Sequence, residues 1–389
     1  MRRVGLALSR STWTPALTPE PVSGLAGDRD RLAELARRAA ERLGYQDHVI
    51  SVGPASIRIR VVGDTLADRL LPAFARANPG GEPQPGPLAS STVVAWDMAE
   101  AALVLPALSL LPRPGDAPRS TYLHDHDHGQ GDGQAQGGIQ AWFQPLEAAV
   151  SLYDHTEATG YYCVRHAAAL PAWESAAPLR ALLRWALADH DLHLVHSAAV
   201  GDARGALLLA ARGGSGKSTS TALCAAAGLQ TAGDDYVVLS PGGPDGSGPQ
   251  VHSLYRTLKV GAELLDRRFA GLETRDAGHD KRSVWLDDVA LGAQVPTMGV
   301  AAIVVPSVAE AARESSFRTV SAAVAIRGLG PSTLLQLPGR AERALAAMSA
   351  VAEQVPAYEG ELGRDLDRVA PDLVELLDRA TSQKHDREL

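Results

Sequence analysis

One short stretch of this 389-residue chain combines the residue types that bind and transfer phosphate. Residues 207–239 read LLLAARGGSGKSTSTALCAAAGLQTAGDDYVVL: an apolar run, a glycine-rich turn, a lysine and then a pair of aspartates. Small residues in such a turn leave backbone N–H groups open to a phosphate, and the helix that follows points its positive end at the same anion. We therefore predict a phosphate-binding loop made of Gly213, Gly214, Ser215, Gly216, Lys217, Ser218 and Thr219.

Two side chains of this loop have defined tasks in such a motif. Lys217 is placed to reach the β- and γ-phosphates of a nucleotide, and the Ser218 hydroxyl to join the shell of a bound Mg²⁺. Ala211 stands where the GxxxxGK(S/T) pattern has its first glycine, a difference of one methyl group. The alternative is a Gly/Ser linker, but a linker is not bracketed by apolar runs such as LLLAA and TALCAAAG.

The spacing of the aspartates matches the geometry of an α/β unit. A helix from Lys217 to Ala227 runs back along the sheet by about 16 Å at roughly 1.5 Å per residue. Gly228 suits the end of that helix, and residues 229–233 return a similar distance as a strand parallel to the first. Asp234 and Asp235 therefore arrive at the carboxyl edge of the sheet, beside the loop, where ligands of α/β proteins bind.

Two carboxylates at this place can divide the work of phosphoryl transfer. One can hold Mg²⁺, and its neighbour can accept the proton of an attacking hydroxyl. The sequence does not determine which of Asp234 and Asp235 takes which task, because the turn could present either side chain. The alternative is a solvated turn, which would be the better interpretation if no phosphate loop preceded the pair.

Other nucleotide-binding classes match the sequence less well. The chain has a single asparagine, Asn78, and so lacks the NKxD signature of guanine-nucleotide binders. It also has no segment resembling the LSGGQ motif of transporter ATPases. Ordinary GTPases and transporter ATPases are therefore excluded.

Lysine is rare in this arginine-rich chain, so a lysine that follows the aspartates is a candidate for binding phosphate or substrate. Lys259, and Lys281 with Arg282, follow the aspartates and could contact phosphate or substrate; the alternative is ordinary surface charge. His124, His126 and His128 alternate in HDHDH and could hold a metal, but their polar, glycine-rich flanks favour a loop. Arg327, in the strand-like segment VAIRGL, has no evident partner.

The bulk composition argues for a cytoplasmic protein with small or peptidic partners. A formal net charge of −8 provides no basic field for nucleic acid or an anionic membrane. Arg10 interrupts the apolar start too early for a signal peptide, and the longest apolar run, about 101–111, is too short for a membrane span. Cys163 and Cys224 lack the spacing of a zinc or redox site, and we expect no disulfide.

The pattern of elements predicts two domains. A helix over 28–44, strands over 56–62 and 91–96, and a meander over 139–165 make the first half α+β, with loops at 78–87 and 112–138. A helix near 177–188 leads into a second half in which strands and helices alternate, including a buried strand at 300–306 and helices near 341–354 and 371–380. We place the domains at 1–185 and 186–389.

Residues 190–240, with His196, the loop and the aspartate pair in this order, resemble the catalytic domain of HPr kinase/phosphorylase and of its bacterial relatives, which include kinases of lasso-peptide clusters. The likeness continues more loosely to about residue 370, through STLLQLPGR and VPAYEGELGRDL. It implies ATP and Mg²⁺ as cofactors, with His196 lining the site. Ala211 and Gly213 replace the family loop's first Gly and its Ser, and a later Glu- and Arg-bearing signature is not found. HPr recognition and the phosphorylase reaction are therefore outside what the resemblance implies.

The sequence thus predicts an α/β protein with a P-loop, HPr-kinase-like catalytic domain and an N-terminal α+β domain that presents the substrate. The expected reaction is transfer of the γ-phosphate of ATP to a Ser or Thr hydroxyl of a peptide or small protein, for example a ribosomal peptide precursor, in a chain that could form homo-oligomers. Catalysis is assigned to Asp234, Asp235, His196 and Lys217, and metal binding to Ser218 and the two aspartates. Lys281 and Arg282 are added to the nucleotide contacts. The alternatives are a kinase of a small hydroxylated metabolite and a non-catalytic nucleotide-binding regulator.

Overall fold

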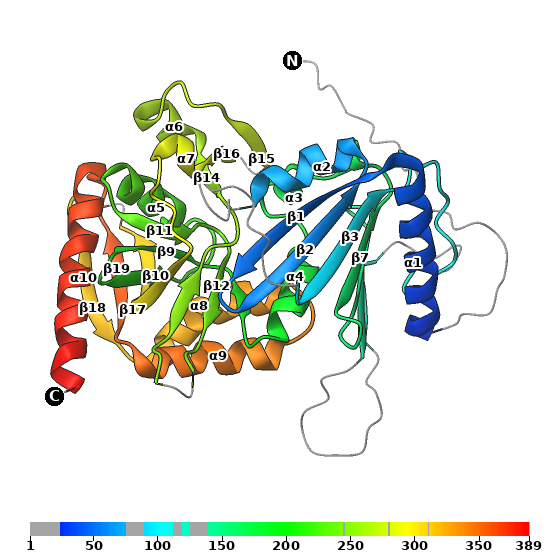
Figure 1. The fold of residues 1–389 in the computed structure, drawn as a ribbon. Helices are drawn as coiled ribbons and strands as arrows, with labels where there is room; N and C mark the ends of the chain where they lie inside the picture. Colours follow the sequence, from blue (N-terminus) through cyan, green and yellow to red (C-terminus); the bar gives the residue numbers. More distant parts are fainter. Residues whose placement is uncertain are drawn as a thin grey trace.

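A computed structural model places two large mixed β-sheets next to one another, with helices on their faces (Figure 1). It describes residues 24–74, 89–111, 119–124, 138–243, 246–278, 281–309 and 311–388, the last five of these as backbone only. The chain is therefore a mixed α/β protein, as its sequence predicts.

The first sheet has seven strands in the order β1-β2-β3-β7-β6-β5-β4. Strands β2, β3 and β7 run parallel, and the other neighbours are antiparallel. The strands are β1 (Tyr45–Val52), β2 (Ala55–Val62), β3 (Ser91–Asp97), β4 (Thr121–His124), β5 (Ile139–Gln144), β6 (Ala149–Asp154) and β7 (Thr159–Val164). The helices of this half are α1 (Gly24–Leu43), α2 (Asp64–Leu70), η1 (Leu71–Ala73), η2 (Ala167–Ala169), α3 (Ala172–Ala176) and α4 (Arg180–Ala188).

The second sheet carries the predicted loop. Its main path is β11-β9-β10-β17-β13-β12-β8, and β19 with β18 continues from β17. The strands are β8 (His193–Val195), β9 (Ala198–Asp202), β10 (Gly205–Leu209), β11 (Gln230–Gly233), β12 (Val237–Ser240), β13 (Gln250–His252), β17 (Thr297–Val308), β18 (Ser316–Val320) and β19 (Ala357–Leu362). The helices are α5 (Lys217–Ala226), α8 (Ala322–Gln336), α9 (Ala341–Gln354) and α10 (Leu366–Glu388).

Helices cover both faces of this second sheet. α8 and α9 pack on one face through residues such as Leu329 and Met348, and α5 and α10 pack on the other through Cys224 and Leu376. Strand β10 is buried along its whole length as a result. Burial on both faces explains why β10 and the middle of β17 are continuous apolar runs rather than alternating ones.

A small sheet, β14-β16-β15, stands beside α5. Its hydrophobic residues, among them Leu258 and Val284, form a cluster with Ala222 of α5. This contact fixes the small sheet close to the start of α5, where the loop ends. The elements are β14 (Thr257–Gly261), β15 (Arg275–Gly278), β16 (Lys281–Trp285), α6 (Ala262–Arg268) and α7 (Leu286–Val289).

Most of the predicted elements are found, and two assignments are wrong. Residues 121–124, expected within a loop, form the edge strand β4, which pairs with β5. The strand-like segment around Arg327 is part of helix α8, because Ala325 and Leu329, one helical turn apart, both face the sheet. The β-branched residues suggested a strand, and packing against the sheet overrides that propensity.

The two halves of the chain share a buried hydrophobic cluster. It contains Ile57 of the first sheet, Val238 of the second, and Leu183 of α4. Residue 185, where we expect the domain boundary, lies inside α4, which runs between the two sheets (Figure 1). Packing between the halves is therefore hydrophobic and continuous.

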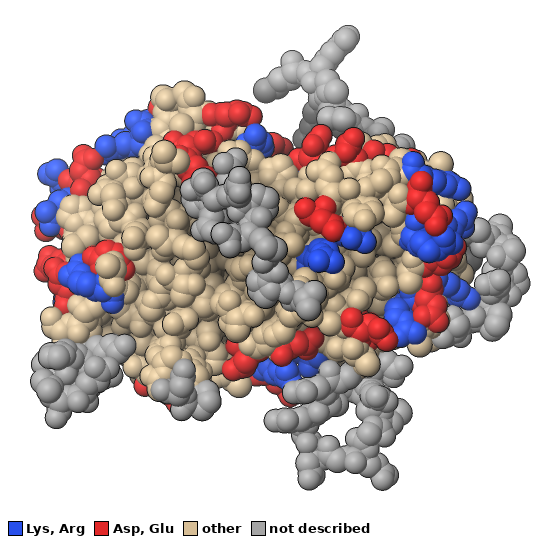
Figure 2. Space-filling model, viewed as in Figure 1, with Lys and Arg blue, Asp and Glu red and all other residues tan. Residues whose placement is uncertain are grey.

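Other predictions from the sequence concern the charge of the surface, membrane spans and the state of the two cysteines. On the face seen in Figure 2, acidic and basic side chains lie close together and neither sign covers a broad area. Across the described ranges, no helix has both the length and the apolar character of a membrane span. Cys163 and Cys224 are both unbridged and buried, as expected.

A glycine pair on α8 provides a test of this packing. A Cβ atom at Gly328 would lie 2.6 Å from the carbonyl oxygen of Ala210 and 2.8 Å from a methyl carbon of Val305, whereas one at Gly330 would meet only Leu334, at 3.8 Å. We expect Gly328→Ala to lower the free energy of unfolding by about 1–3 kcal/mol, because α8 must move off the sheet. Gly330→Ala, the matched control, should leave it unchanged or raise it by up to about 1 kcal/mol. Urea unfolding measures both, and equal effects of the two substitutions would contradict the close packing of α8.

Candidate functional site

The predicted loop connects strand β10 to helix α5 at the carboxyl edge of β10. Gly214 and Gly216 have φ angles of 84° and 97°, a conformation that favours glycine, and a Cβ atom at Gly216 would lie 2.7 Å from Leu362. The Lys217 ammonium folds back and donates hydrogen bonds to the carbonyl oxygens of Ala211 and Arg212, at 2.5 and 3.2 Å. The lysine is thereby held over the loop.

Lys217 is buried, with 6 % of its surface exposed. Burial lowers its pKa, the negative charges of Asp234 and Asp235 act in the opposite direction, and the positive charge of Lys281 lowers it further. These influences also show that the two aspartates and Lys281 lie near enough to Lys217 to affect its charge. An anion bound at the loop would raise this pKa again, because it favours the charged ammonium.

The aspartate pair follows β11, which runs in the same direction as β10. The strand between them, β9, pairs antiparallel with both, so β10 and β11 end at the same edge of the sheet without being neighbours. Asp235 has a φ angle of 65°, in the left-handed region that is uncommon for residues other than glycine. The sequence-based geometry is therefore correct in direction, with β9 as an intervening strand.

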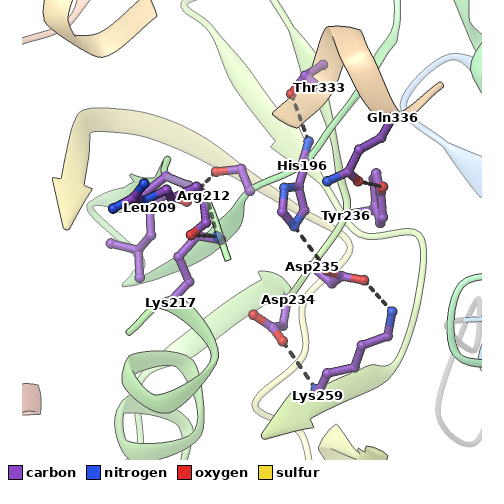
Figure 3. A network of polar contacts seen from close by, with 12 residues as sticks. His196, Leu209, Arg212, Lys217, Asp234, Asp235, Tyr236, Lys259, Thr333 and Gln336 are labelled. Atoms are coloured by element: carbon purple, nitrogen blue, oxygen red, sulfur yellow. Dashed lines mark hydrogen bonds and ion pairs between the residues drawn. The ribbon is translucent and has the colours of Figure 1, made fainter. Parts of the chain in front are cut away.

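Asp235 is held between a histidine and a lysine (Figure 3). One carboxylate oxygen lies 3.1 Å from Nε2 of His196, and the other accepts a hydrogen bond from the ammonium of Lys259 at 2.6 Å. Burial alone would raise the pKa of Asp235, but Lys259 and His196 together hold it well below the usual value. Asp235 is thus a carboxylate at neutral pH.

Asp234 has the opposite character. It is fully buried, and its pKa is raised by burial and by the charge of Asp235, against the influence of hydrogen bonds from Ser218 and from the backbone of Lys259. The Lys259 N–H lies 3.3 Å from Oδ2, whereas Oδ1 is buried without a hydrogen-bond partner among the described residues. A positive charge placed beside this oxygen would lower the pKa of Asp234.

His196 lies between β8 and β9 and is fixed on two sides. Its backbone N–H donates to the Thr333 hydroxyl of α8 at 3.0 Å, and its ring lies 5.3 Å from the ring of Tyr236. Since ionised Asp235 can only accept, Nε2 must carry the hydrogen of their shared bond. Nδ1 is buried and has no hydrogen-bond partner in the part of the chain that the structure describes.

Arg180, whose side chain is 16 % exposed, contacts the ring of Tyr236. The Arg180 guanidinium lies 5.6 Å from the centre of the Tyr236 ring and pairs with Glu174 at 3.2 Å. The Tyr236 hydroxyl donates to the side-chain oxygen of Gln336 on α8. His196 therefore rests on a ring whose own position is fixed by two further elements.

The remaining predicted residues are distributed as follows. Ser218 and Thr219 lie half-buried in the first turn of α5, and Ser215 is buried within the loop. Lys281 is near Lys217, but Arg282, 47 % of whose side chain is exposed, lies 3.9 Å from Asp266 of α6. His124 ends β4, and His126 and His128 lie outside the described residues. Within the described ranges no cluster of three or more His, Cys, Asp or Glu side chains suits a metal.

Sequence reasoning did not find every residue of this site. The rarity of lysine makes Lys259 a candidate for binding phosphate or substrate, but nothing in the sequence indicates its contact with Asp235. Tyr236, Thr333 and Arg180 carried no signal, because their contacts arise from elements far apart in the chain. The chain matches no protein-family model, and no curated protein shows a significant match to it.

The Asp235–Lys259 pair predicts a charge-dependent stability. Lys259 is 11 % and Asp235 20 % exposed, so Lys259→Met leaves a largely buried carboxylate with only His196 beside it. We expect the free energy of unfolding at pH 7.5 to fall by about 2–4 kcal/mol. The stabilisation from the depressed pKa of Asp235 exists above the carboxylate's unfolded pKa and is lost as pH falls through its folded value. The difference between wild type and variant should therefore shrink in acid.

A double variant separates charge from packing in this experiment. Adding Asp235→Asn to Lys259→Met removes the unpaired charge and should recover most of the lost stability at pH 7.5. Lys281→Met, which removes another lysine of the small sheet, should cost less. Urea unfolding at pH 7.5 and 4 measures these differences, and a double variant less stable than Lys259→Met would contradict the role given to the pair.

Proposed function

We propose that this chain is an ATP- and Mg²⁺-dependent kinase of the HPr-kinase-like group, acting on a Ser or Thr hydroxyl of a peptide or small protein. The observation that carries the proposal is the meeting of a glycine loop, its lysine and a buried aspartate pair at one edge of the sheet. The pair has opposite pKa shifts, which is how two adjacent carboxyl groups acquire different tasks.

The loop would hold the phosphates of ATP. Backbone N–H groups of residues 213–218 and the start of α5 provide positive potential without a large net charge. Lys217, now bonded to two loop carbonyls, would exchange these for phosphate oxygens, a stronger and charge-assisted contact.

The donor set beside the loop suits Mg²⁺. The unpartnered Oδ1 of Asp234 and the adjacent Ser218 hydroxyl are both hard oxygen ligands, and Mg²⁺ prefers such ligands together with phosphate oxygens. Bound there, the ion would neutralise charge on the β- and γ-phosphates. This assigns Asp234 to the metal and leaves Asp235 for the acceptor.

Asp235 and His196 would orient and deprotonate the acceptor hydroxyl. Its oxygen forms a bond to the γ-phosphorus as the bond from phosphorus to the bridging oxygen of ADP breaks, and its proton passes to the Asp235–His196 pair. Lys259 keeps Asp235 ionised and in place throughout. A pure nucleotide-binding regulator has no use for this second carboxylate, so the kinase is the better interpretation.

Lys217 provides the test of nucleotide binding. We expect Lys217→Ala to raise the Kd for Mg²⁺–ATP tenfold or more, because the variant loses the ammonium group that is hydrogen-bonded to the loop and would bind the phosphates. Titration calorimetry measures this, with Lys384→Ala near the C-terminus as control. Unchanged affinity in Lys217→Ala would place the nucleotide elsewhere.

The aspartates test catalysis separately from binding. Asp235→Asn should keep the Kd for Mg²⁺–ATP within a few-fold while phosphotransfer falls by about 10²–10⁴-fold, since a neutral amide cannot accept a proton. Asp234→Asn should also weaken the dependence on Mg²⁺. Asp288→Asn, at the exposed second residue of the Asp–Asp pair of α7, is the matched control.

Release of ADP with water as acceptor, and mass analysis of Ser/Thr peptides incubated with ATP, report this activity. Full activity in both aspartate variants would exclude the kinase. Transfer to a small polyol but to no peptide would keep the chemistry and change the substrate class.

A further inference from the structure

A pocket of about 830 Å³ opens beside the loop and is not used by the site described above. Loop residues 211–215 form one wall, the end of β17 a second, and helix α8 a third. Because the sheet order is β11-β9-β10-β17-β19, this pocket and the aspartate pair that follows β11 lie on opposite sides of β10. The loop runs between them.

Two serine hydroxyls in this pocket lack hydrogen-bond partners among the described residues. They are Oγ of Ser215, a residue with 9 % of its surface exposed, and Oγ of Ser332 on α8. Pro331 has no N–H, so the carbonyl of Arg327 one turn earlier cannot receive the usual helical bond from it. Leaving such groups unsatisfied is costly, and a polar ligand would supply what they lack once a χ1 rotation turned either buried hydroxyl towards it.

The rest of the pocket has a mixed polar and apolar lining. Val305, Val308 and Val324 provide aliphatic walls, and Arg327 and Glu359 lie at the edge. The volume lies within the range of roughly 300–1,000 Å³ that is typical of small-molecule sites. A flat, partly apolar ring joined to a hydroxylated sugar matches this combination of walls, hydroxyls and guanidinium group.

We infer that this pocket binds the base and ribose of the nucleotide, with α8 as its recognition element. The inference rests on the proposed function: if the outermost phosphate faces Asp234 and Asp235, the phosphate chain crosses the loop and its nucleoside end emerges on the side of β17 and α8. Close packing of Gly328 against Ala210 holds α8 at the distance that forms this pocket.

Comparison of two ligands tests the inference, because tripolyphosphate has the phosphates of ATP without the nucleoside. In Val324→Trp the new ring fills the pocket. We expect its Kd for Mg²⁺–ATP to rise at least tenfold and its Kd for Mg²⁺–tripolyphosphate to stay within twofold of wild type. Leu335→Trp, at a position of α8 that is 85 % exposed and outside the pocket, should change neither value.

A second, smaller substitution controls for the possibility that Val324→Trp disturbs the fold. Ser332→Ala removes only one oxygen atom and should weaken ATP binding several-fold while sparing tripolyphosphate. Unchanged ATP affinity in both pocket variants, or equal weakening of both ligands, would overturn the inference; a rise only in the KM of a phosphate acceptor would do so too and assign the pocket to that substrate. If wild type binds neither ligand, the proposed function itself fails.

Discussion

Two adjacent carboxyl groups at the end of one strand, one buried and the other largely buried, are the constraint on which this site depends. Two full negative charges on neighbouring residues repel each other strongly in a low-dielectric environment. The fold gives Asp235 two partners, His196 and Lys259, and leaves Asp234 with hydrogen bonds but without an ion pair to any residue that the structure describes. One group is thereby a stable anion, and the pKa of the other is raised.

This solution requires three separate parts of the chain to be in position. His196 comes from the second sheet and is fixed by Thr333 of α8, and Lys259 comes from the small sheet packed on α5. The backbone contributes as well, because a left-handed conformation at a residue other than glycine costs on the order of 1 kcal/mol or more. That cost at Asp235 is offset by the two contacts its side chain makes.

The part of the site that could be predicted from the sequence is the part whose structure is determined by residues close together in the chain. The strand, loop, helix and returning strand from Gly205 to Gly233 follow from apolar runs, glycines and segment lengths, and those lengths bring Asp234 back to the loop's edge. The contact of Lys259 with Asp235 and that of Thr333 with His196 could not be predicted, since they depend on how distant elements pack. Helix α8 shows the same limit, because its β-branched residues suggested a strand and only the sheet beneath it favours a helix.

The N-terminal half also contributes to the site, through a contact in the shared core. Arg180 belongs to α4, which packs in the cluster shared by both sheets, and its guanidinium lies against the ring of Tyr236. That ring in turn lies against His196, whose Nε2 bonds Asp235. A shift of α4 relative to the second sheet would therefore be transmitted to the orientation of the imidazole. Packing between the two halves and the geometry of the acidic pair therefore depend on the same chain of contacts.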